Sequence, residues 1–346
     1  MNNLKKVGLT ALAGSLALTA AHAGEMSVSG SMVATYNKRD TKESTGNPFG
    51  MKTNLTFSGS SELDNGMTAS MFTTSSDKFA GQFSGKISLD MGDAGTIALD
   101  QASGGGAYMV DDKMPSAYEE SWDNLDTGYT AGKMDYTHTG GINYTNTFSD
   151  VNVDLLYRKG GGASNADGAT ATAGASGGNV KSFNLQTSAL MDGLSLGMGY
   201  QTIDTFADGD DEESTFYVTY ASPMGLSVGI QTYELDDAAT ANSDEDSDMY
   251  GVAYSVNDNL SISYGVKSTD FTASGAGDTM KTTGIGAAYS SGGITLSIQK
   301  NEGECAGGYC TSSNEDENLE VAVSVSYTHL RAHETVLDLV CRLLLE

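Results

Sequence analysis

The sequence predicts an all-β fold: a sixteen-stranded antiparallel transmembrane β-barrel with a long third loop folded inward. Apolar and polar residues alternate with period two along most of the chain, which is typical of strands with one apolar face. Short turns alternate with longer polar connections between these segments. Only 18% of the residues are charged, yet no internal run is apolar enough for a membrane helix, which needs about 20 such residues.

The chain begins with the pattern of a secretory signal. Lys5 and Lys6 supply a positive start, residues 7–20 form a short apolar core, and Ala21-His22-Ala23 is a small-x-small cleavage pattern. We therefore expect residues 1–23 to be a signal peptide and residues 24–328 to form the barrel. A membrane anchor is the alternative, but the apolar core is short for that role.

Sixteen segments with strand-like alternation follow the signal, and seven short turns and eight longer connections join them. An even strand number, with short turns at one end and long loops at the other, is typical of outer-membrane barrels. Closure also leaves no unpaired strand edge, as a bilayer requires. A barrel of this size encloses water, which suits its Ser-, Thr- and Asn-rich second face. The expected strands are 26–36, 51–58, 67–74, 81–91, 96–101, 135–148, 151–158, 181–191, 194–204, 214–221, 226–235, 249–256, 260–269, 279–289, 294–301 and 318–327.

Residues 101–134 interrupt this alternation for longer than any other stretch before residue 150. They contain Trp122, the only tryptophan, and a group of carboxylates. A connection longer than about 15 residues in a compact domain is usually functional or disordered. We interpret this one as a functional loop that sets the size and charge of the lumen.

The chain resembles the Gram-negative general porins from Gly24 to about Thr328. The signal end AHA, the order of hairpins, the long third loop and the last strand NLEVAVSVSYT carry the resemblance. It implies a homotrimer in outer-membrane lipid, with three separate pores that pass small hydrophilic solutes and ions by passive diffusion. It also implies that carboxylates on the inward third loop face basic residues on the wall. The implied constriction residues are Asp111, Asp112, Glu119, Glu120, Asp123, Lys52, Lys86 and Arg158.

The positive electrostatic field of the wall opposite the loop should be weaker than is usual in this family. General porins favour a cluster of arginines on the wall, whereas this chain has two arginines before its last segment. Pore-lining carboxylates favour cations, and acidic outer loops enrich cations further. We therefore predict a modest preference for cations. For any single carboxylate, ordinary solvation is an equally good interpretation.

Residues 329–346 depart from the family pattern. Porins of this type end in an aromatic residue, whereas this segment has helical spacing and contains His329, His333 and Cys341. It resembles translated adapter sequence joined to a truncated gene. We predict that the segment is an artefact and assign it no function.

Two other functions are compatible with a barrel. A structural or adhesive barrel would have a plugged lumen and loops that bind partners. An enzyme would need a nucleophile, a base and an orienting group, but His138 is the only histidine between the signal and the last segment. We predict no catalytic residues, and the net charge of −27 argues against nucleic acid.

Cys305 and Cys310 enclose the sequence AGGY, whose glycines allow the chain to fold back, so we predict a disulfide between them. A metal site is the alternative, but two cysteines without a nearby histidine make a poor one. We predict no cofactor. Loose binding of Ca²⁺ or Mg²⁺ at acidic outer loops, residues 208–213 and 244–248, is a lesser option, because neither has the spacing of a calcium-binding loop.

Overall fold

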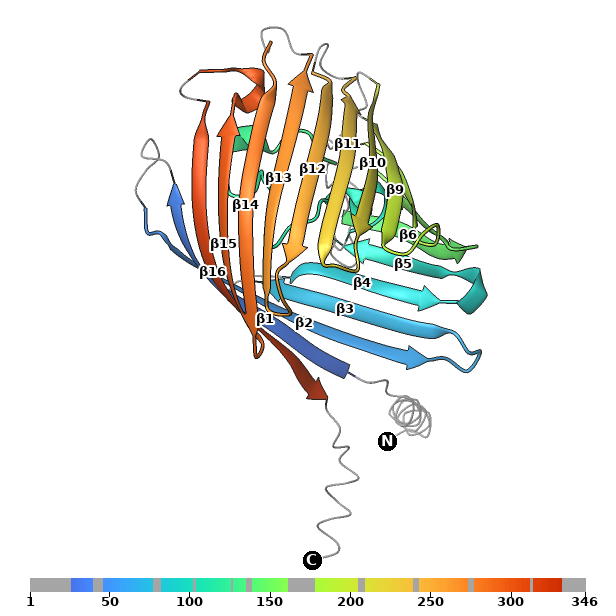
Figure 1. The fold of residues 1–346 in the computed structure, drawn as a ribbon. Coiled ribbons are helices and arrows are strands. Elements are labelled where there is room, and N and C mark those ends of the chain that lie inside the picture. The colour runs from blue at the N-terminus through green and yellow to red at the C-terminus, as the bar shows by residue number, and fades with distance from the viewer. Residues whose placement is uncertain are drawn as a thin grey trace, which may run out of the picture.

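The computed structural model describes residues 26–39, 46–76, 82–101, 104–125, 127–134, 139–160, 178–204, 209–238, 243–272, 277–311 and 314–331. These residues form a closed barrel of sixteen antiparallel strands (Figure 1). Each strand pairs with its neighbours in the sequence, and β1 pairs with β16 to close the barrel. The predicted fold class and strand number are therefore confirmed.

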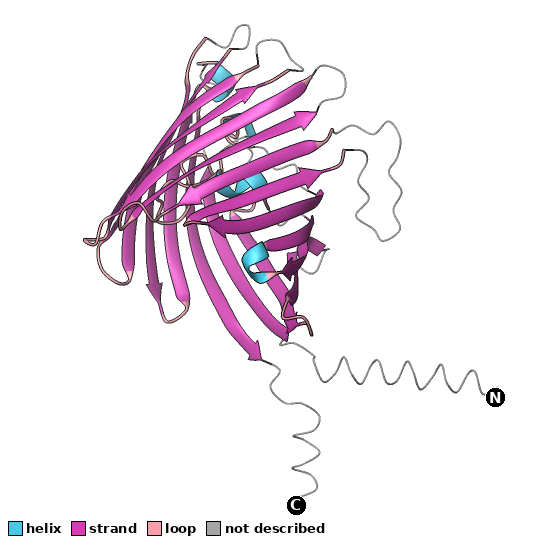
Figure 2. Ribbon diagram, turned by 90° about the vertical axis from the view of Figure 1, so that its right-hand side faces the viewer, coloured by secondary structure: helices cyan, strands magenta, loops and turns pink. Residues whose placement is uncertain are grey.

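The strands are tilted around the barrel (Figure 2), and short 3-10 turns lie among the connections. Their bounds are β1 Met26–Arg39, β2 Phe49–Glu62, β3 Thr68–Ser76, β4 Gln82–Asp90, β5 Thr96–Gln101, β6 Thr139–Phe148, β7 Val151–Arg158, β8 Val180–Thr187, β9 Leu194–Asp204, β10 Asp210–Ala221, β11 Leu226–Asp236, β12 Glu245–Ser255, β13 Leu260–Phe271, β14 Met280–Ser291, β15 Ile294–Glu304 and β16 Asp316–Arg331. The 3-10 turns are η1 Gly92–Ala94, η2 Gly106–Val110, η3 Thr127–Tyr129 and η4 Ala306–Gly308.

The two faces of the wall differ in polarity. In β14, Ile285 is 62% exposed, whereas its neighbours Gly284 and Gly286 are buried or half-buried. In β11, Ile230 is 51% exposed while the next residue, Gln231, is 1% exposed. Apolar side chains thus point outward and polar ones inward, which suits a barrel surrounded by lipid and filled with water. Among the described residues, no helix is long and apolar enough to cross a bilayer.

Several strand ends differ from the prediction, among them one end of each of β8, β10 and β12. β8 ends at Thr187, because the chain turns at residues 188–193 and the Leu194 amide donates to the Met191 carbonyl. β10 begins at Asp210 and β12 at Glu245, so most of the acidic residues expected in loops 208–213 and 244–248 belong to strands. The backbone pairing continues through them, with Asp210 opposite Asp204 and Glu245 opposite Phe271. The predicted loop placement was therefore wrong for these residues.

β16 continues to Arg331, three residues beyond the expected end of the barrel at residue 328. The predicted signal, His138 and residues 332–346 lie outside the described residues. Their assignments remain predictions.

Candidate functional site

The connection between β5 and β6 is the candidate site. Its described part, residues 104–125 and 127–134, is called the third loop below. In both ribbon views it is drawn within the outline of the barrel (Figures 1 and 2). Its hydrogen bonds reach Lys86 on β4 and polar-face side chains from β7 round to β16, so it contacts more than half of the strands.

The loop is first attached to the wall at η2. The Gly106 amide donates to Asp154 Oδ1 at 2.9 Å, and the Ala107 amide donates to Ser182 Oγ at 2.6 Å. The Asn184 side chain donates to the Gly106 carbonyl. Ala107 is fully buried, so this turn is fixed against β7 and β8 by both its amides and its packing.

Gln231 of β11 holds the next part of the loop. Its side-chain nitrogen donates to the carbonyls of Val110 and Asp111, and its side-chain oxygen accepts from the Lys113 amide at 3.1 Å. Gln231 is 1% exposed, so these bonds are shielded from water. One glutamine thereby satisfies three backbone groups of an irregular segment, which has no regular pairing of its own.

Glycines on the polar face allow the loop to approach the wall closely. A Cβ at Gly199 would lie 2.6 Å from Val110, and a Cβ at Gly229 would lie 2.7 Å from Pro115. Any side chain at these positions would push the loop off the wall. The same close approach recurs at Gly251, Gly284 and Gly303.

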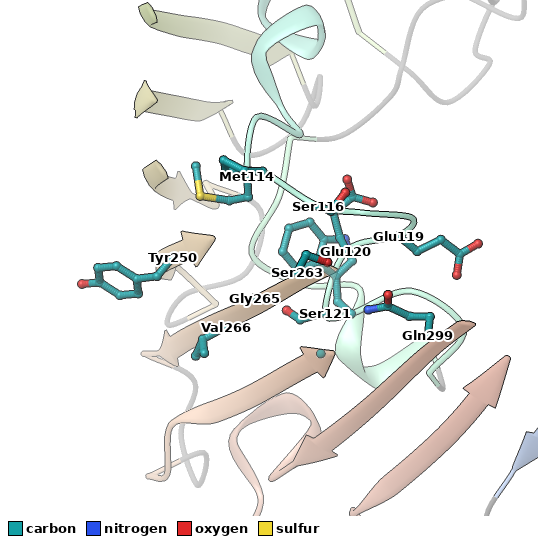
Figure 3. A pocket seen from close by; sticks show the side chains of 13 residues that line it. Met114, Ser116, Glu119, Glu120, Ser121, Tyr250, Ser263, Gly265, Val266 and Gln299 are labelled. Atoms are coloured by element: carbon teal, nitrogen blue, oxygen red, sulfur yellow. The ribbon is translucent and has the colours of Figure 1, made fainter. Parts of the chain in front are cut away.

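The middle of the loop crosses the strands at the end of the chain. Figure 3 shows Ser116, Glu119 and Glu120 of the loop near Ser263 and Gln299 of the wall. A small pocket lies between the loop and the wall, lined by Ser121, Trp122 and Ser263 among others. Further hydrogen bonds to the wall run from Tyr118 to Glu320 (2.7 Å), from Asn301 to the carbonyls of Glu120 and Asp123 (both 2.8 Å), and from Asn318 to the carbonyl of Asn124 (2.8 Å).

The five predicted loop carboxylates have different environments. Asp111 is 3% exposed and accepts the Met134 amide at 2.7 Å, so it joins the two legs of the loop. Asp112 is exposed. Glu119 and Asp123 are half-buried, and they accept from the Asn124 side chain at 2.5 Å and from the Glu120 amide at 3.1 Å.

Burial against the wall raises the pKa of these carboxyls. The pKa of Glu119 rises to about 8, first through burial and then through the negative charges of Glu320 and Asp123. The pKa of Glu120 also rises to about 8, through burial and its interaction with Asp123. Burial and Asp112 raise the pKa of Asp111 to about 8. These groups therefore gain negative charge as the pH rises through about 8.

The three predicted wall bases do not form one cluster opposite the loop. Lys86 of β4 lies 3.4 Å from Asp100 of β5, and it donates to the Gly104 carbonyl at 3.3 Å. Its partner is therefore a wall carboxylate and not one of the five predicted ones. Lys52 is exposed on β2, and Arg158 is half-buried at the end of β7.

Sequence reasoning missed the lysines whose charges act on the pKa values of the loop carboxylates Asp111 and Asp112. The positive charge of Lys133 counteracts the raised pKa of Asp111 and Asp112, and the charges of Lys267 and Lys113 do the same for Asp112. Lys267 is fully buried on β13, where its ammonium donates to the carbonyls of Tyr129 and Ala131. Its place in the polar phase of that strand, between Gly265 and Thr269, was a signal that could have identified it.

Cys305 and Cys310 are joined by a disulfide, with their Cα atoms 4.1 Å apart. The bond closes the turn that contains η4 at the outer end of β15. Within the described ranges, no group of three or more His, Cys, Asp and Glu side chains is placed to hold a metal ion.

Comparison with known proteins agrees with this architecture. A family model described as Gram-negative porin matches residues 8–303. A search of curated protein sequences gives no significant match. An engineered variant of the Rhodopseudomonas blastica porin is similar in fold, with a TM-score of 0.57 and 16% identity over 87% of this chain and 100% of that chain. A second structure, described under asymmetric conductivity of engineered proteins, has a TM-score of 0.56 and 16% identity over 88% of this chain and 100% of that chain.

At such low identity the two structures support the fold alone, whereas the family model carries the assignment by sequence. Its match extends over most of the chain and includes the strands that hold the third loop as far as β15. The closed barrel, with an apolar outer face and a polar inner one, is the architecture that this match requires. The chain therefore belongs to the Gram-negative porin family.

Proposed function

We propose that the third loop narrows the lumen of this porin and gives it a modest preference for cations. A Gram-negative porin is an outer-membrane channel for the passive diffusion of small hydrophilic solutes, and its family is one of channels rather than enzymes. The observation that carries the proposal is the series of hydrogen bonds that holds the third loop on the polar face from β7 to β16. A segment held there leaves the permeation path beside the wall of β1 to β4.

The charge of the third loop supports the preference for cations. Above a pH of about 8, where Asp111, Glu119 and Glu120 are charged, its described carboxylates outnumber its lysines: Asp111, Asp112, Glu119, Glu120 and Asp123 against Lys113 and Lys133. On the wall opposite, the positive charge of Lys86 is offset by Asp100. A carboxylate-rich constriction favours cations over anions, and the acidic chain as a whole attracts them to the mouth.

The remaining predictions belong to the same proposal. We infer a homotrimer in outer-membrane lipid, exported with the help of residues 1–23 and functional without a cofactor. Loose binding of Ca²⁺ or Mg²⁺ would use the acidic outer ends of β10 and β12, where Asp210 and Glu245 lie. Such binding would be weak, because these side chains are spread along strands and not gathered in one loop.

The test is the reversal potential of the purified channel in a planar bilayer with a KCl gradient, at a pH above about 8 where Glu119 and Glu120 are charged. We expect the reversal potential to have the sign that indicates a preference for cations. The double variant Glu119→Gln/Glu120→Gln should move the potential toward zero. The control Glu234→Gln/Asp236→Asn removes the same charge from the exposed outer end of β11 and should have a smaller effect. Anion preference of the unmodified channel would overturn the proposal.

A further inference from the structure

We propose that Lys267 and the disulfide-closed turn between β15 and β16 clamp the return leg of the third loop, residues 128–131, from two sides. The clamp would hold the constriction in one position during permeation. This inference rests on the proposed function, because the position of the return leg matters for current only if the third loop narrows the lumen.

Lys267 forms the wall side of the clamp. Its ammonium donates to the Tyr129 carbonyl at 3.0 Å and also to the Ala131 carbonyl, so it holds the backbone on both sides of Thr130. The same ammonium lies 4.8 Å from the centre of the Trp122 ring on the outgoing leg. Lys267 is fully buried, so these contacts are shielded from water. One side chain therefore connects both legs to β13.

The turn that contains η4 forms the outer side of the clamp. The Tyr129 hydroxyl donates to the Asn314 carbonyl at 2.6 Å, and the Ala306 amide donates to the same carbonyl at 3.1 Å. A Cβ at Gly128 would lie 3.0 Å from the Ala306 Cβ, so turn and return leg are in direct contact. Tyr129 is 1% exposed beneath this cover.

The disulfide makes this cover rigid. Hydrogen bonds also hold the turn. Two of them join it to Asp278, from Asp278 N–H to the Gly308 carbonyl at 3.2 Å and from Cys310 N–H to Asp278 Oδ2 at 3.4 Å, and others lie within the turn itself. A covalent cross-link restricts the open conformations of the chain that it closes. Cutting the link would let the turn move away from Tyr129, and the return leg would then be held from the wall side alone.

Reduction of the bond provides the test on the folded channel. Dithiothreitol supplies two electrons and two protons, so the S–S bond becomes two thiols while the reagent closes to its own disulfide. Single channels would be recorded before and after the reagent is added. The Cys305→Ser/Cys310→Ser variant serves as the control that cannot respond to it.

The wall side is tested with Lys267→Met. Its matched control is Lys181→Met, which removes the same charge from an exposed outward position on β8. Each variant would be recorded under the conditions used for the unmodified channel. If Lys267→Met yields no folded channel, the reduction experiment still decides the proposal.

The clamp predicts that reduction adds sub-conductance steps and excess noise to the open-channel current. The Cys305→Ser/Cys310→Ser and Lys267→Met variants should show this noise without reagent, and Lys181→Met should not. An open-channel current that stays equally quiet after verified reduction would overturn the proposal. That result differs from a failure of the proposed function, which would leave the reversal potential unaffected by Glu119→Gln/Glu120→Gln.

Discussion

At the scale of single residues, Gln231 explains how an irregular segment is held on a wall of strands. Its replacement in Gln231→Leu would leave the buried carbonyls of Val110 and Asp111 without their donor. We expect a local cost of about 1–3 kcal/mol, the usual penalty for a buried polar group that loses its partner. Hydrogen exchange should therefore be faster at the amides of residues 110–113.

The control for this prediction is the adjacent residue. Thr232→Val changes an exposed side chain on the opposite face of the same strand and should leave the exchange of residues 110–113 unchanged. Equal exchange in Gln231→Leu and the unmodified protein would show that Gln231 does not hold the loop.

Titration of the loop carboxyls gives a second prediction at this scale. Because the pKa values of Glu119 and Glu120 are raised to about 8, both groups are largely protonated below that pH and charged above it. The permeability ratio of K⁺ to Cl⁻ should therefore increase as the pH rises through about 8. Reversal potentials measured across this range check the prediction, and Glu119→Gln/Glu120→Gln should remove most of the pH dependence. A ratio that falls with rising pH would contradict it.

At the scale of the strand, the alternation of faces predicts that an introduced arginine costs much more stability on the outward face than on the inward face. Ile285→Arg would place a charge on the outward face near the middle of β14 and should cost about 2–4 kcal/mol of folding stability in lipid. Asn54→Arg on the polar face of β2 should cost far less and should weaken the preference for cations. Denaturant unfolding in lipid vesicles measures the free energy of unfolding of both variants. Equal losses of stability would contradict the assignment of outward and inward faces.

The same alternation explains how much of the fold the sequence could predict. Period-two patterns with intervening turns give strand number, order and face, because each strand has one apolar side. The starts of β10 and β12 were missed because Asp210 and Glu245 are charged and disturb the apolar pattern, although their backbones remain paired. Charged side chains are tolerated there because they lie at the ends of strands and not in the apolar band.

The candidate site was less predictable than the fold. The position of the third loop in the chain was evident, but its partners depend on how ten strands are brought round the barrel. Lys86 meets Asp100 because β4 and β5 are paired in one register, which the sequence pattern did not show. Gln231 and Lys267 are far from the loop in sequence. They could be proposed as its partners only because they lie on the polar face of their predicted strands.

At the scale of the whole molecule, the proposed function requires that ions pass beside the third loop. Ser116 is an exposed loop residue, whereas Met224 is 80% exposed in the turn between β10 and β11. In a Cys341→Ser background, Ser116→Cys and Met224→Cys each supply one reactive thiol, and the Cys305–Cys310 disulfide is left intact. Both sites can then be labelled with a cationic methanethiosulfonate reagent.

The decisive measurement is the single-channel current of these two variants during labelling. A loop that narrows the lumen predicts a stepwise fall in current for Ser116→Cys, because the added group occupies the path and repels cations, and little change for Met224→Cys. An unchanged current for Ser116→Cys, with labelling confirmed by mass spectrometry, would show that ions do not pass the third loop.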